Sequence, residues 1–271
     1  MTVLAAAIAL IGSLFFALGA ALQQFEALGS GKTRLRTLVR RPRWVIGGAS
    51  IVAGGGLHIV ALGLGPLTIV QPMGVASLLF ALPLAAALHG RRPSRAELGS
   101  AAVVATGLIG LVLLVPPSTG PSHLSLQEVA TLLAVSGVAA VLLWAGSRIA
   151  SPAGRAALLA TSAGVLYGAT ATLMRVLADT FGEQGWNWWY LLALPIPALL
   201  ALMLLQRAYA VGHFGVSFAS LQIADPLTAV AFGALLLGEP LPTGVAPIAA
   251  AALTAVGTVA LARTTPLERS A

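Results

Sequence analysis

Hydrophobic residues occur in long, uninterrupted runs rather than in the alternating pattern of strands. No charged residue interrupts the run from Met1 to Phe25 or the run from Trp44 to Gly90. A helix needs about 20 apolar residues to cross a bilayer, so the second run is long enough for a helical hairpin. Only helices and closed barrels satisfy their backbone groups in lipid, and apolar runs without alternation are typical of helices. The pattern predicts an all-α, polytopic membrane protein.

Turn residues between the apolar runs divide the chain into about nine predicted transmembrane helices. The predicted spans are 3–24, 44–63, 66–88, 97–115, 128–147, 156–178, 188–207, 215–237 and 243–262. Two of the helix starts, "SRAE" from Ser94 and "SLQE" from Ser125, fit the capping box, in which the Ser and Glu side chains each satisfy a free backbone amide. Pro195 and Pro197 are expected to kink the seventh span.

Composition and charge agree with a membrane location. The chain is 58% hydrophobic and 8% charged, whereas about a quarter of the residues of a soluble domain are charged. With nine spans and the N-terminus outside, every Lys and Arg except Arg175 falls in a segment that faces the cytoplasm, as the positive-inside rule requires. We predict a multi-pass protein of the inner (plasma) membrane with a cytoplasmic C-terminus. The net charge of +7 then reflects topology, and no nucleic-acid partner is expected.

The two ends of the chain resemble each other as an internal repeat. "GSLFFALGAALQQ" and "GVLYGATATLMRV" share the spacing of glycines, aromatics and small residues, and "ELGSAAVVATGLIG" resembles "PIAAAALTAVGTVA". Gln71 and Gln222 fall at nearly equivalent places. We predict two four-helix repeats, 3–115 and 156–262, inverted by a linker helix at 128–147, an arrangement typical of secondary transporters. The alternative is that helices rich in Ala, Gly and Leu resemble one another without a repeat.

At "LGLGPLTIVQPMGVASLLFALPLAA" and "SFASLQIADPLTAVAFGALLLGEPL" the chain resembles the drug/metabolite transporter superfamily. The second segment contains Pro226 and the Leu-Gly-Glu turn that ends at Glu239, and the first half looks more like the nine-span NIPA-type branch. The resemblance implies a transporter, and for this branch a magnesium transporter. The chain departs from the pattern in two places: the turn of the first half contains His89 and no acid, and the first span has only Glu26, at its inner end.

Asp225 is the strongest candidate for a binding residue. It lies about ten residues into the eighth span, near the bilayer centre, where an ionised acid costs on the order of 3 kcal/mol unless it faces a cavity, has a partner or is protonated. Gln222 is on the same face of that helix, and Pro226 leaves a backbone carbonyl without its helical donor. A proton-binding or cation-binding role is one interpretation, and a neutral Asp that bonds a neighbouring helix is the other.

Three further polar positions are weaker candidates. Gln71, as the repeat counterpart of Gln222, and His58, after a run of small residues, complete the predicted substrate-binding set, although either could only bond a neighbouring helix. Arg175 is expected to pair with Asp179, four residues further along, and the alternative is that it recruits an anionic substrate. Glu239 is expected to be a cap or a loop anchor.

The sequence therefore predicts a transporter that moves a small metabolite or a cation through the bilayer by alternating access. The alternatives are a magnesium transporter, a flippase for a lipid or polyprenyl-linked substrate, and a membrane scaffold without transport. The chain contains no cysteine, which excludes thiol chemistry, and it contains no recognisable enzyme motif. No cofactor is expected, and a homodimer is compatible with the pattern.

Overall fold

The protein is described from a computed structural model that covers residues 2–30, 35–65, 67–114, 123–183 and 188–266. Throughout these residues the regular structure is helical. The helices are α1 (Thr2–Ser30), α2 (Leu35–Leu38), α3 (Pro42–Leu64), α4 (Leu67–Leu88), α5 (Arg95–Leu114), α6 (Leu126–Ser147), α7 (Pro152–Glu183), α8 (Trp188–Ala193), α9 (Pro195–Tyr209), α10 (Phe214–Leu237) and α11 (Val245–Thr264). The predicted all-α fold is confirmed.

Eight stretches of helix in the described chain are long and apolar enough to cross a membrane. They are α1, α3, α5, α6, α7, α10, α11 and the continuous segment Trp189–Tyr209 formed by α8 and α9. The remaining predicted span, 66–88, corresponds to α4 (Leu67–Leu88), where the apolar stretch of described side chains, Met73–Leu88, is shorter than a span requires. The protein is therefore a polytopic helical membrane protein, and the count of nine remains a prediction.

Local sequence explains where several helices begin. Both predicted capping boxes are confirmed: the backbone amide of Glu97 donates to Ser94 Oγ at 3.1 Å, and Ser125 and Glu128 bond each other in the same reciprocal way. At the predicted kink of the seventh span, α8 ends at Ala193 and α9 starts at Pro195, although Leu194 between them keeps helical dihedral angles and its amide donates to the carbonyl of Tyr190 at 3.0 Å. Proline favours the first position of a helix, where its missing amide hydrogen costs nothing.

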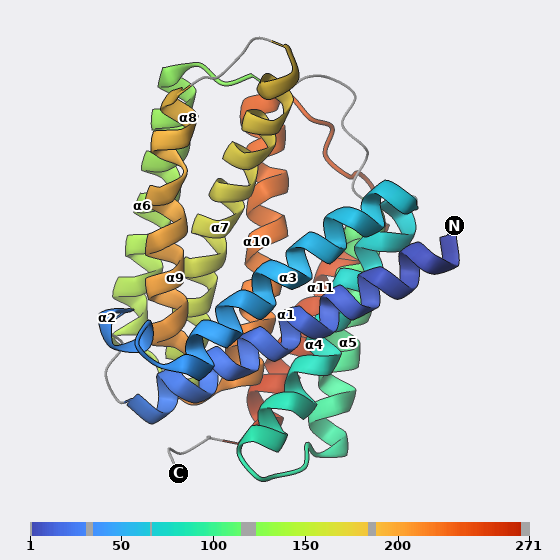
Figure 1. Cartoon of the computed structure of the whole chain (residues 1–271), viewed down its shortest axis with the longest axis vertical. Helices are drawn as coiled ribbons and strands as arrows, with labels where there is room; N and C mark the ends of the chain where they lie inside the picture. The colour runs from blue at the N-terminus through green and yellow to red at the C-terminus, as the bar shows by residue number, and fades with distance from the viewer. Residues whose placement is uncertain (1, 31–34, 66, 115–122, 184–187, 267–271) are drawn as a thin grey trace.

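The helices form two groups, each arranged around its first long helix. In the first half (α1, α3, α4 and α5), α1 packs against α3 and α4; in the second half (α7, α9, α10 and α11), α7 packs against α9 and α10. The helix between the halves, α6, packs on α7. Figure 1 shows α1 and α3 running side by side and obliquely across the direction of α6, α7 and α9.

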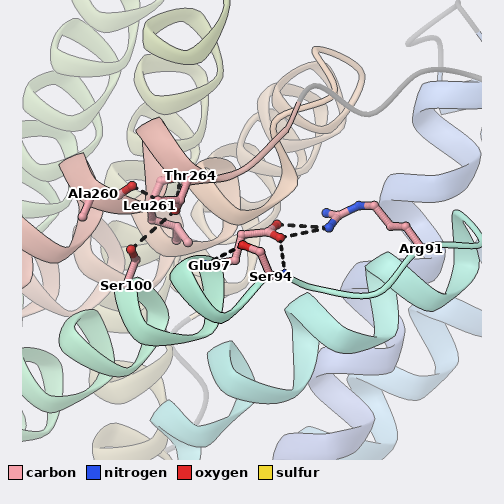
Figure 2. Close-up of polar contacts among 7 residues, drawn as sticks. All are labelled: Arg91, Ser94, Glu97, Ser100, Ala260, Leu261 and Thr264. Carbon is pink, nitrogen blue, oxygen red and sulfur yellow. Dashed lines mark hydrogen bonds and ion pairs between the residues drawn. The ribbon is translucent and has the colours of Figure 1, made fainter.

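α5 and α11 join the halves along their length, and two glycines make the close approach possible. A Cβ atom on Gly107 would lie 2.7 Å from the backbone nitrogen of Thr254, and one on Gly257 would lie 2.7 Å from the backbone nitrogen of Val104. Any side chain at either glycine would therefore push the two helices apart. Thr264 Oγ1 also donates to Ser100 Oγ at 3.4 Å, as Figure 2 shows, so the pairing extends to the end of α11.

The largest buried apolar cluster, the shared core, contains residues from both halves. Its members are Ala17, Ala20, Ala21, Ala27, Val75, Leu78, Ala81, Leu82, Ala85, Ala101, Val104, Ala105, Leu108, Ala140, Ala163, Leu166, Ala201, Leu205, Tyr209, Phe214, Phe218, Ala219 and Leu261. In α1, α4 and α9 these residues lie toward the C-terminal end, and in α7 and α10 they lie toward the N-terminal end. The shared core therefore occupies one end of the molecule.

At the other end each half has its own core. The first-half core consists of Ala5, Ala9, Ala61 and Val70, and the second-half core consists of Leu124, Val129, Leu132, Ala169, Leu173, Val176, Tyr190, Ala193 and Phe232. The clusters share no member, although α1, α4, α7 and α10 each contribute residues both to the shared core and to one of these smaller cores. The described halves thus share a core at one end, whereas at the other end their cores are separate and the contact between α5 and α11 still joins them.

The end that contains the shared core is also the arginine-rich end. It includes the end of α1, the start of α3, the turn from α4 to α5, the turn from α6 to α7 and the end of α11. Arg41 pairs with Glu26 here at 2.8 Å, and Arg43 lies over the ring of Phe25 at 5.6 Å. The α4–α5 turn and the end of α11 lie together at the bottom of Figure 1, whereas the C-terminal end of α7 lies at the top.

Candidate functional site

Asp225 lies where the shared core ends along α10. Ala219 belongs to the shared core, Phe232 belongs to the second-half core, and Asp225 lies between them on the same helix. α10 continues through Pro226, which cannot donate to the carbonyl of Gln222. A carboxyl group and a freed backbone carbonyl therefore occur one turn apart at the level where the two halves begin to pack separately.

Two glycines of α7 let that helix approach the backbone of Asp225 directly. A Cβ atom on Gly164 would lie 3.1 Å from the backbone nitrogen of Asp225, and one on Gly168 would lie 2.6 Å from its backbone oxygen. This spacing of four residues places both glycines on one face of α7. The segment "GVLYG" also contains Tyr167, so the close packing brings a phenol ring to the neighbourhood of the acid.

The carboxylate of Asp225 has no hydrogen bond and no ion pair within the described part of the chain. Its side chain is half-buried, and Tyr167 is close enough to interact with it electrostatically without a hydrogen bond. Tyr209, which is buried in the shared core, interacts in turn with Tyr167. An acid at mid-span without a fixed partner is free to bind a proton or a positively charged group.

Gln222 connects α10 to the first half of the molecule. Its Nε2 atom donates to Ser77 Oγ of α4 at 3.0 Å, and Ser77 is buried in the packed interface between these helices. Gln222 and Asp225 are thus brought together on one helix, as predicted, but Gln222 already has a partner in the other half. In this arrangement Gln222 links the halves.

The other two predicted site residues lie in the first half. His58 on α3 contacts Gly74 of α4, where a Cβ atom would lie 3.1 Å from the Cε1 atom of the imidazole. The Nδ1 atom of His58 is buried without a hydrogen-bond partner in the described chain. Gln71 belongs to α4, but its side chain lies outside the described residues. The structure therefore tests neither His58 nor Gln71 as a binding residue.

At the end opposite the arginines, an ion pair connects α7 to the chain that follows α10. Arg175 pairs with Glu239, and the backbone amide of Glu239 donates to the carbonyl of Gly233 at 3.1 Å. Glu239 thus anchors the turn, as predicted, and also neutralises a cation on α7. The side chain of Asp179, the partner expected from the sequence, lies outside the described residues.

A second group of buried polar residues was not predicted as a unit. Gln206 of α9 is fully buried; its Nε2 atom donates to Gln23 Oε1 at 3.1 Å, and its Oε1 atom accepts from Trp44 Nε1 at 3.0 Å. These side chains come from α9, α1 and α3, which are far apart in the sequence. Each residue taken singly is ordinary for a helix end at the membrane surface, so the sequence carries no signal for the contact.

Another buried acid has a local, structural explanation. Glu97 is 1% exposed, yet both of its carboxylate oxygens accept from Arg91 Nη1 at 3.1 Å, and Oε2 also accepts from the backbone amide of Ser94 at 2.8 Å (Figure 2). The charge of this acid is therefore satisfied where the turn enters α5. In contrast to Asp225, Glu97 has a cation and a backbone amide as fixed partners.

Metal ligands do not gather within the described chain. No group of three His, Asp or Glu side chains that could hold a metal ion occurs among the described residues. Mg²⁺ in proteins usually keeps several waters and binds one or two carboxylates. Asp225 can supply one carboxylate, and the described residues around it supply uncharged phenol and amide groups.

Comparisons with known proteins give a similar chain but no family. An uncharacterized protein of Corynebacterium glutamicum is 29% identical over 97% of this chain and 96% of its own length. No protein-family model matches the chain, and no solved structure matches it. The similarity thus extends over nearly the full length of both chains.

Proposed function

We propose that the chain is a secondary transporter of the drug/metabolite type, which moves a small metabolite or a cation by alternating access. The observation that carries this proposal is the place of Asp225. Its carboxylate has no partner among the described residues, and it lies where the shared core gives way to the two separate cores. A mid-membrane acid at the junction of two halves is the arrangement that a carrier needs.

The contact between α5 and α11 supports the proposal that the halves are inverted repeats. Gly107 approaches Thr254, and Gly257 approaches Val104. The two glycines are 150 positions apart in the sequence, and so are their two partners. These contacts are the same interaction made twice, as across a two-fold axis. Such an axis would relate 3–115 to 156–262, with α4 as the third of nine spans and α6 as the linker helix.

The distribution of charge supports the proposed orientation. The arginine-rich end would face the cytoplasm under the positive-inside rule, which leaves the N-terminus outside and the C-terminus inside. In this orientation the end at which the halves pack separately faces outward. The conformation described would then be closed between α1, α3 and α9 toward the cytoplasm.

Magnesium transport is the second candidate, and the proposed membership of the NIPA-type branch favours it. The single unpartnered acid favours a monovalent cation or a protonated metabolite instead, since Mg²⁺ would have to keep most of its waters beside Asp225. A flippase for a lipid or polyprenyl-linked substrate is the third candidate, and a cavity open to the acyl chains would favour it.

Transport by purified protein in liposomes tests the proposal. A panel of radiolabelled amines, amino acids and metabolites, with Mg²⁺ as a separate arm, is offered to wild-type protein, to Asp225→Asn and to the matched control Glu128→Gln. Glu128 is an acid of the α6 capping box. We expect at least one substrate whose uptake falls to background in Asp225→Asn and is retained in Glu128→Gln.

Three results would contradict parts of this proposal. Equal uptake by Asp225→Asn and wild type would remove Asp225 from the mechanism. Magnesium uptake abolished by Asp225→Asn, with no organic substrate transported, would place the magnesium function first. Movement of a fluorescent lipid between leaflets by the wild-type protein, without transport of any solute, would favour the flippase.

A further inference from the structure

The buried contact among Gln23, Trp44 and Gln206 crosses from one half of the protein to the other. Gln23 and Trp44 belong to α1 and α3, and Gln206 belongs to α9. Gln206 is 0% exposed, Gln23 is 3% exposed and Trp44 is 8% exposed, so water does not reach the interface between them. Both polar atoms of the Gln206 amide are used, one as donor and one as acceptor.

A buried primary amide is costly unless both of its ends are paired. Gln206 obtains its two partners from different helices of the first half, so the second half satisfies this amide only while α1 and α3 are in place. A small displacement of either helix would break a hydrogen bond without offering a replacement in the apolar surroundings. Loss of either bond therefore leaves a buried polar atom of Gln206 unpaired.

The apolar residues around this polar contact also come from both halves of the protein. Leu205 and Tyr209, which flank Gln206, belong to the shared core together with Ala20 and Ala27 of α1. At the other end of the molecule the halves have separate cores, and the ion pair between Arg175 and Glu239 there lies within the second half. The described structure is thus closed between α1, α3 and α9 at the arginine-rich end alone.

We infer that Gln23, Trp44 and Gln206 form a latch that holds the arginine-rich end of the protein closed. This inference rests on the proposed transport function and adds the conformational state and the contact that maintains it. Opening of the latch would separate α9 from α1 and α3 and expose the part of the shared core between them. The pairing of α5 with α11 would keep the halves joined meanwhile.

The cysteine-free chain allows a direct test, because one introduced cysteine is the only thiol. Ala20→Cys places that thiol in the shared core, one turn before Gln23, where the residue is 3% exposed. The rate of its reaction with a maleimide in detergent-purified protein measures how often this end opens. In the otherwise unchanged chain we expect slow labelling.

Removal of the latch in Gln206→Leu or in Gln23→Leu is expected to raise the labelling rate of that thiol at least about tenfold. A tenfold increase corresponds to a decrease of about 1.4 kcal/mol in the free energy needed to open this end. Trp44→Phe, which removes one donor and leaves the bond between the two glutamines, is expected to give a smaller increase and serves if the leucine variants fail to fold. The matched control is Ser162→Ala, which removes a hydrogen bond from a fully buried hydroxyl to Ala140 of α6. We expect the control to label as slowly as the parent.

Two outcomes would overturn the latch. Slow labelling in folded Gln206→Leu and Trp44→Phe would mean that the contact does not hold this end closed. Equally fast labelling in Ser162→Ala would mean that loss of any buried hydrogen bond loosens the protein. The labelling measurement uses no substrate, so failure of the latch is distinguishable from failure of transport in the Asp225→Asn experiment.

Discussion

Replacement of Gly107 by Ala tests the closest contact between the two halves. The added Cβ atom would lie 2.7 Å from Thr254 N and 2.8 Å from Ala250 O, whereas ordinary contact begins at 3.4 Å. The two helices must therefore separate by about 0.6–0.7 Å at this point, because backbone atoms cannot rotate away. Such overpacking typically costs about 1–3 kcal/mol, partly offset by the roughly 1 kcal/mol higher helix propensity of Ala.

Unfolding by sodium dodecyl sulfate in mixed micelles, followed by tryptophan fluorescence, measures this loss. We expect Gly107→Ala to lower the free energy of unfolding by up to about 2 kcal/mol after this offset, and by about 1–3 kcal/mol relative to a glycine-to-alanine change without the close contact. The matched control is Gly99→Ala on the same helix, where a Cβ atom would meet nothing within 4 Å and stability is expected to be equal or slightly higher. The reciprocal contact predicts a similar loss for Gly257→Ala.

Two results would refute the reasoning. If Gly107→Ala were as stable as Gly99→Ala, α5 and α11 would not approach as closely as described. If Gly107→Ala were destabilised while Gly257→Ala was not, the two contacts would not be the same interaction made twice. The second result would also remove the main structural support for an inverted repeat.

Three further predictions concern groups away from this contact. Tyr190→Phe leaves both the backbone amide and the carbonyl of Leu124 unpaired in a buried position. The free energy of unfolding should therefore fall by about 1–3 kcal/mol in the same assay, and an unchanged value would contradict these hydrogen bonds. Arg91→Gln leaves the carboxylate of Glu97 without its cation and should lower the free energy of unfolding by about 3 kcal/mol. The double variant Arg91→Gln, Glu97→Gln should recover much of this loss, and an equal loss in the single and the double variant would refute the ion pair. Burial lowers the pKa of His213 below its ordinary 6.5, so the unfolded state binds a proton more readily than the folded state. The free energy of unfolding should therefore fall as the pH decreases through 6.5, and His213→Gln should reduce this dependence on pH.

Local patterns predicted the helices and several of their boundaries. The capping boxes at Ser94 and Ser125 formed as expected, because their partners are three residues away and depend on nothing beyond the first helical turn. The prolines of the seventh span mark the boundary between α8 and α9 within one continuous apolar segment, since proline acts on its own turn. In contrast, α7 continues to Glu183, beyond the predicted end at 178, because no strong breaker stands there.

The candidate site was predictable only in part. Asp225 was identified because a carboxylate in an apolar run is unusual in any fold. Its neighbourhood with Tyr167 depends on the approach of α7 through Gly164 and Gly168, and the bond from Gln222 to Ser77 joins helices from different halves. Such neighbours are set by the packing of surfaces distant in the sequence, which local patterns do not specify.

The sequence by itself determined that this protein is a helical membrane protein, since uninterrupted apolar runs can satisfy their backbone groups in lipid only as helices. It also determined which end carries the arginines, and that one acid stands near the middle of a span. Only the tertiary structure decided that the halves share a core at the arginine-rich end, that Gln206 completes a contact with Gln23 and Trp44 there, and that Glu239 pairs with Arg175. The reason is physical: in lipid every helix is equally apolar outside, so close fit and a few polar pairs between helices choose the neighbours.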